Sequence, residues 1–125
     1  MEFKHFRAGQ PPLEVHMLAT RTASGLIIQL LGGDKPHIGA TVITHPRPSL
    51  TEPGKVSCNS IVIPELGHKE DELAKPLAEK VAINYNCPVV VVAGIHVEHA
   101  TDVQIKQIKN LCEQLVNKLI ASCPL

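Results

Sequence analysis

Three short segments of this chain place a histidine close to a glycine. They are residues 32–39, residues 66–70 and residues 93–99. Glycine lets the backbone approach a ligand closely, and imidazole offers a hydrogen bond or a metal ligand near neutral pH. If the fold brings the three segments together, their histidines would surround one compact site for a small polar or anionic molecule. These histidines are His37, His68 and His96.

The first segment has the richest chemistry. Gly32 and Gly33 would present main-chain N–H groups to an anion, Lys35 would add positive charge, and His37 would point at the ligand. The alternative is a hairpin loop in which the glycines satisfy positive φ and Asp34 caps a turn. The spacing matches neither a Walker A loop nor a dinucleotide-binding fingerprint.

The other two segments add two histidines. His68 precedes an expected helix, whose N-terminal amides favour an anion, although the acidic residues 70–72 would repel a phosphate. His96 and Glu98 project from one face of an expected strand and resemble the start of the zinc-deaminase H-x-E signature, but its P-C-x-x-C partner is absent. Zinc held by His37, His68 and His96 stays an alternative, and so does a hydrogen bond from each ring to backbone.

Composition narrows the classes of function. The 125 residues suffice for one domain, and 12 basic residues balance 12 acidic ones, which argues against a nucleic-acid partner. Aromatic residues are scarce, so the core must be aliphatic. No signal peptide is apparent, and the longest apolar run, Pro88 to Val97, is too short to span a membrane. We expect a soluble cytoplasmic protein with four reduced cysteines and no C-x-x-C pair.

Residues 1–12 look like a variable N-terminal tail, and hydropathy periods predict a single α+β domain over residues 13–125. The expected order is β-β-β-β-α-β-α: a mainly antiparallel sheet of about five strands with two helices on one face. Pro76 predicts that the first helix begins near Lys75 or bends there. Thr101 and Gln104 form a capping box for the second. The expected strands cover residues 13–20, 26–31, 38–45, 56–63 and 88–97. The last of these is so apolar that we expect a central strand covered on both faces.

Three stretches, GGDKPHIGA, LGHKEDELAKPLAEKVA and CPVVVVAGIHVEHATDVQIKQI, resemble the small accessory subunit of gallate-type hydroxyarene decarboxylases, a prenylated-flavin chaperone family. The resemblance implies a non-catalytic homodimer with a proteasome-assembly-chaperone-like fold. Such a protein would transiently bind prenylated FMN or FMN, without a metal, and assist maturation of a decarboxylase catalytic subunit. The positions that match the family motif are Gly32, Gly33, Asp34, His37, His68 and His96.

Two other functions remain open at this point. A small enzyme could use His96 and Glu98 as an acid–base pair, or the three histidines as metal ligands. A ligand-free assembly partner would instead dock through a sheet face or a helix. Nucleophilic catalysis has little support, because no serine lies in a G-x-S-x-G elbow.

Overall fold

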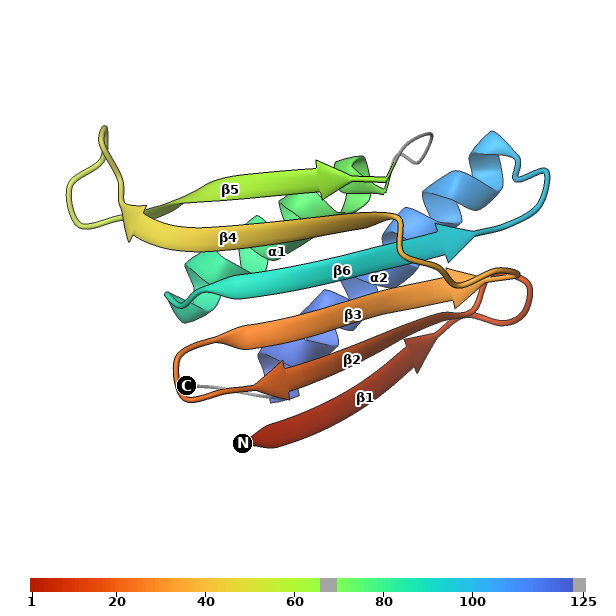
Figure 1. Cartoon of the computed structure of the whole chain (residues 1–125), viewed down its shortest axis with the longest axis horizontal. Coiled ribbons are helices and arrows are strands. Elements are labelled where there is room, and N and C mark those ends of the chain that lie inside the picture. Colours follow the sequence, from red (N-terminus) through yellow and green to blue (C-terminus); the bar gives the residue numbers. More distant parts are fainter. Residues whose placement is uncertain (66–69, 123–125) are drawn as a thin grey trace.

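The computed structural model describes residues 1–65 and 70–122. One six-stranded sheet carries two helices on a single face, as Figure 1 shows, so the predicted α+β class is confirmed. The predicted order holds with one strand added at the N-terminus. The elements are β1 Glu2–Ala8, β2 Val15–Arg21, β3 Leu26–Gly33, β4 Ala40–Pro48, β5 Val56–Pro64, α1 Asp71–Tyr85, β6 Val89–His96 and α2 Asp102–Ser122.

Strand β1 is the element that the sequence did not reveal. It lies antiparallel beside β2 at the edge of the sheet, with Phe6 opposite Met17. Its inward side chains are only partly apolar: Phe6 and Ala8 pack against the core, whereas the Lys4 Nζ donates to the Ser122 carbonyl at 3.1 Å. Such an edge strand shows weak hydropathy alternation, and segment 1–12 therefore looked like a tail.

The order of strands across the sheet is β1-β2-β3-β6-β4-β5. Strand β6, late in the chain, lies between β3 and β4, parallel to β3 and antiparallel to β4. Consequently the C-terminal ends of β3 and β6 and the start of β4 meet at one end of the molecule (Figure 1). That end also receives the first turn of α1. This topology is what positions the candidate site.

The core lies between the sheet and the helices and is aliphatic, as composition predicted. Leu115 and Leu119 of α2 are buried there with Met17. The Tyr85 hydroxyl of α1 donates to the Leu119 carbonyl at 3.1 Å and so ties the two helices together. Burial raises the pKa of Cys112 in this layer to about 12, so this thiol is an inert core group.

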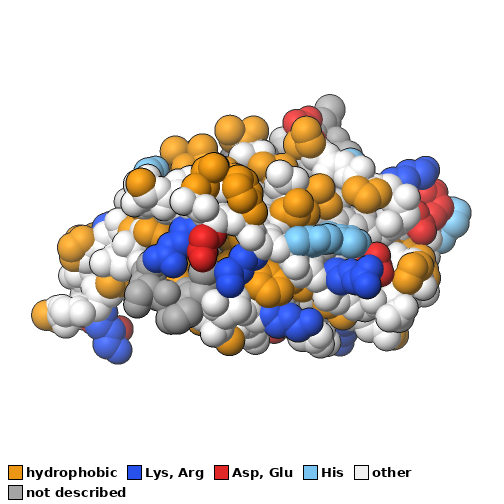
Figure 2. Space-filling model, turned by 90° about the horizontal axis from the view of Figure 1, so that it is seen from below, with side chains coloured by type: hydrophobic (Ala, Val, Ile, Leu, Met, Phe, Trp, Pro, Cys, Tyr) orange, Lys and Arg blue, Asp and Glu red, His pale blue; other side chains and the backbone are white. Residues whose placement is uncertain are grey.

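The opposite face of the sheet carries neither of the two described helices (Figure 1). We expected β6 to be covered on both faces, and that expectation is wrong: alternate residues of β6 are only half-buried. Exposed apolar side chains, among them Leu18, Ile27 and Ile61, lie on this open face, since their strand neighbours point into the core. Figure 2, in which the open face is uppermost, shows hydrophobic side chains along that margin.

The local signals at the helix ends predicted one boundary correctly and one wrongly. Helix α1 begins at Asp71 and continues through Pro76, so a start near Lys75 is wrong. The capping box at α2 is confirmed: the Gln104 N–H donates to Thr101 Oγ1 at 3.1 Å, and the Thr101 N–H donates to Gln104 Oε1 at 3.0 Å. Within the described ranges, neither helix combines the length and the hydropathy needed to cross a membrane.

Candidate functional site

The loop after β3 crosses the end of β6 at very short range. Gly33 lies opposite His96 in the parallel register, and the Asp34 N–H donates to the His96 carbonyl at 2.7 Å. Gly33 has φ +76, and a Cβ there would lie 2.1 Å from the His96 carbonyl oxygen. Only glycine satisfies both requirements. The loop is therefore held against the strand that carries His96.

Gly94 permits the second close approach. The His37 N–H points to the Gly94 carbonyl at 3.4 Å, and a Cβ on Gly94 would lie 1.5 Å from the His37 carbonyl oxygen. The main chain at His37 thus lies directly over β6 where no side chain exists. Gly94 was not among the predicted site residues, although the sequence places it two residues before His96.

The predicted approach of His37 and His96 is found. Their ring centroids are 6.2 Å apart in an edge-to-face arrangement. The third predicted histidine, His68, lies outside the described residues. Two of the three histidine segments thus meet at one end of the sheet.

Glu70, at the start of α1, is a site residue that the sequence did not identify. Its Oε1 lies 2.7 Å from His37 Nε2, and His37 Nδ1 lies 2.9 Å from the Lys35 carbonyl oxygen. A carbonyl oxygen only accepts, so Nδ1 donates to it, and Nε2 faces the Glu70 carboxyl group. Glu70 therefore orients the His37 ring.

A second polar network fixes His96. His96 Nε2 lies 3.1 Å from Glu98 Oε2, which also accepts from Lys35 Nζ at 3.4 Å. These hydrogen bonds, that from His96 foremost, hold the pKa of Glu98 below its usual value. The Glu98 N–H donates in turn to Asp34 Oδ2 at 3.0 Å. The expected placement of His96 and Glu98 on one face is consistent with this contact.

The two predicted glycines have structural partners of their own. Gly32 lies within β3 between Val15 of β2 and Ile95 of β6, and the Gly33 N–H donates to the Glu14 carbonyl at 3.0 Å. The Gly33 amide thus holds the loop to β2. In this structure the two glycines shape the site, and the side chains of Lys35, His37 and His96 line it.

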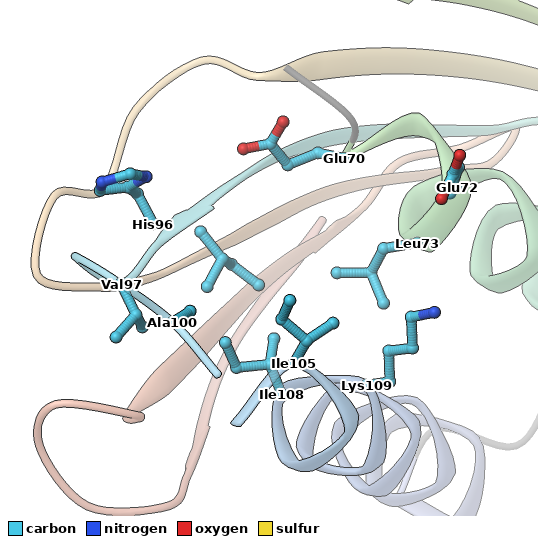
Figure 3. A pocket seen from close by; sticks show the side chains of 10 residues that line it. Glu70, Glu72, Leu73, His96, Val97, Ala100, Ile105, Ile108 and Lys109 are labelled. Atoms are coloured by element: carbon cyan, nitrogen blue, oxygen red, sulfur yellow. The ribbon is translucent and has the colours of Figure 1, made fainter. Parts of the chain in front are cut away.

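Two hollows flank His96. The larger, of about 400 Å³, lies between the start of α1, the end of β6 and the first turns of α2 (Figure 3). The smaller, of about 330 Å³, is lined by Lys35, His37, Ile38 and His96. The larger hollow has the size of a ligand pocket. Its lining residues are Glu70, Glu72, Leu73, Ile95, His96, Val97, Ala100, Ile105, Ile108 and Lys109.

The described residues give no support to a metal centre or to an activated thiol. Among residues 1–65 and 70–122, no set of three or more His, Cys, Asp or Glu side chains is arranged to hold a metal ion. Cys58, Cys87 and Cys112 are free thiols, and burial raises the pKa of each of them. A raised pKa reduces the thiolate fraction, so none of these three is an activated nucleophile.

Comparisons with known proteins bear on the fold and on the family. A search of curated proteins finds no match. A chain from a chaperone complex for yeast 20S proteasome assembly has a similar fold, with a TM-score of 0.57, 14% identity, and coverage of 94% of this chain and 95% of that one. The family model of the prenylated flavin chaperone LpdD-like domain matches residues 9–123. The chain therefore belongs to the prenylated flavin chaperone LpdD-like family.

Proposed function

We propose that this protein binds prenylated FMN, or FMN, without transforming it and delivers it to a hydroxyarene decarboxylase of the gallate type. The observation that carries the proposal is the meeting of His37 and His96 beside a hollow of about 400 Å³, in a chain of this family. Gly32, Gly33 and Asp34 would shape the loop, and His37 and His96 would contact the cofactor. His68 belongs to the proposed binding set through the family motif.

The residues present fit such a cofactor. Lys35 supplies positive charge for a phosphate beside the His37 ring, whose two nitrogens contact the Lys35 carbonyl and Glu70, and the larger hollow supplies apolar walls for a ring system. Among the described residues, no aromatic side chain of Phe, Tyr or Trp lines either hollow, so the ring would be held without stacking on one. Modest affinity follows, which suits a protein that passes its ligand on. The prenylated flavin would supply the decarboxylation chemistry in the partner enzyme.

Replacement of His37 tests binding. We expect His37→Ala to weaken binding of the flavin about tenfold or more, because it removes a wall of the smaller hollow together with the imidazole that faces the Glu70 carboxylate, which would then repel the phosphate. Titration calorimetry with purified flavin measures this. His45→Ala is the matched control, since His45 is an exposed residue of β4 that lines neither hollow. Equal affinity of wild type and His37→Ala would contradict the proposed site.

Delivery of the flavin to the decarboxylase is tested by a separate measurement. The decarboxylase catalytic subunit should contain flavin in a larger fraction of its molecules when it is produced together with the wild-type protein than when it is produced together with His37→Ala. Equal loading with wild type, with His37→Ala and without the protein would rule out delivery. We place this activity in the cytoplasm, in keeping with the free thiols of Cys58, Cys87 and Cys112.

We further propose that the protein is a homodimer joined through the open face of the sheet. The support is the row of exposed apolar side chains there: Ile27 is 45% exposed, Ile61 60% and Ile63 57%. An apolar surface of this kind is costly in water and marks an interaction site. The balance of 12 basic and 12 acidic residues leaves little net repulsion between two copies.

Charge introduced on that face tests the dimer. Sedimentation should give a dimer for wild type and a monomer for Ile61→Lys, because a lysine facing its own symmetry mate would be desolvated. Ile83→Lys, on the exposed side of α1 at 41% exposure, is the matched control and should stay dimeric. A wild-type monomer at high micromolar concentration would overturn this part of the proposal.

A further inference from the structure

We infer that the larger hollow distinguishes prenylated FMN from unmodified FMN by enclosing the prenyl-derived hydrocarbon between α1 and α2. The inference rests on the proposed flavin binding and adds its specificity-determining residues, Leu73, Ile105 and Ile108. The sequence alone did not assign these residues to a site. They come from two helices that the site histidines do not occupy.

The walls of the hollow are aliphatic. Leu73 projects from the first turn of α1, and Ile105 and Ile108 project from α2 toward the same space, as Figure 3 shows. Ile105 remains 43% exposed although it faces this space. Open aliphatic walls of this kind gain free energy when a ligand covers them. Hydrophobic attraction grows with the apolar area that is buried. Such walls therefore bind a branched hydrocarbon more strongly than the polar edge of a flavin ring.

The charges that line the two hollows determine which end of the cofactor enters each of them. The lining of the larger hollow carries two carboxyl groups, those of Glu70 and Glu72, against one cation, Lys109, and this balance disfavours a phosphate. The smaller hollow carries Lys35 and His37 instead. His96 borders both hollows, so one elongated molecule can pass it with its phosphate beside Lys35 and its hydrocarbon end beside Ile108. The phosphate and the ring system are common to both flavins, whereas the added hydrocarbon, with the extra apolar area that it can bury against Ile105 and Ile108, belongs only to the prenylated form.

The size of the preference follows from buried hydrocarbon. Each buried methylene group contributes about 0.8 kcal/mol, so enclosing roughly two of them gives a preference of about tenfold or more for prenylated FMN. Truncation of Ile105 or Ile108 removes part of that wall. Removal of the Lys35 charge weakens both flavins alike and leaves their ratio unchanged.

The experiment is a calorimetric titration of the full chain with purified prenylated FMN and with FMN under the same anaerobic conditions. Wild type should prefer prenylated FMN about tenfold or more, and Ile105→Ala combined with Ile108→Ala should lower that ratio several-fold. Ile83→Ala, at 41% exposure against 43% for Ile105, is the matched control and should keep the wild-type ratio. Lys35→Ala should weaken both ligands and preserve the ratio.

A second variant changes the same hollow by filling it, so the inference stays testable if the alanine variants do not fold. Ala100→Leu adds volume to the wall and should also reduce the preference, while a thermal melt reports folding. Similar affinity of wild type for both flavins would overturn the inference and leave the carrier function standing. An unchanged ratio in both cavity variants would overturn it as well. Absence of binding for either flavin would instead defeat the proposed function itself.

Discussion

A Gly94→Ala variant should lose about 3 kcal/mol of folding free energy and bind flavin poorly. A methyl group at this position would lie 1.5 Å from the His37 carbonyl oxygen, which is main chain and cannot rotate away. Overpacking typically costs about 1–3 kcal/mol or somewhat more, and here relief requires the His37 loop to leave β6. Chemical denaturation measures the first effect, and flavin titration of the remaining folded protein measures the second.

Gly54→Ala is the matched control for this variant. Gly54 has φ +79 in the loop between β4 and β5, and a Cβ added there would meet no described heavy atom within 4 Å. Its replacement should cost only about 1 kcal/mol, through the positive φ, and should leave flavin binding unchanged. If Gly94→Ala were as stable as Gly54→Ala and bound flavin normally, the His37 loop would not lie on β6.

A Leu115→Ala variant should lose about 3 kcal/mol of unfolding free energy while the surviving folded protein keeps its flavin affinity. Leu115 is fully buried where α2 packs on the sheet, and truncation of a buried leucine costs about 2–5 kcal/mol through lost burial and the cavity left behind. Val103→Ala, 65% exposed on the same helix, should change stability by less than about 0.5 kcal/mol.

The comparison of Leu115→Ala with Val103→Ala distinguishes effects on the core from effects on the site. Equal denaturation midpoints for Leu115→Ala and Val103→Ala would contradict the packing of α2 against the sheet. Loss of flavin binding in folded Leu115→Ala would mean that the hollow depends on the whole helix layer. Gly94→Ala should behave differently, because it displaces a site residue directly.

Much of this fold was readable from local patterns. Alternation predicted β2 through β5, and the apolar run after Pro88 predicted β6, because a buried strand needs β-branched side chains. Strand β1 was missed because an edge strand needs few apolar residues. The coverage of β6 was misjudged, since an apolar strand can also face an open side of a sheet that is itself apolar.

The site could be predicted from the sequence only in part, because its residues are brought together by the order of the strands in the sheet. His37 and His96 are 59 residues apart, counting from their sequence numbers, and meet because β6 enters between β3 and β4. No local pattern encodes that strand order. Glu70 appeared as one of several acids that start a helix, and only its 2.7 Å contact with His37 reveals its role. Ile105 and Ile108 fitted the apolar stripe of the last helix. Nothing in the sequence distinguished a residue that lines a hollow from one that is buried in the core.

Native mass spectrometry of this protein, produced in cells that also synthesise prenylated FMN, tests the central claim most directly. We predict a bound species with the mass of prenylated FMN in wild type and in His45→Ala. This species should be lost from His37→Ala and reduced when Ile105 and Ile108 are both replaced by alanine. Ligand-free wild-type protein, or prenylated FMN retained equally by His37→Ala, would contradict a flavin site between His37, His96 and the start of α2.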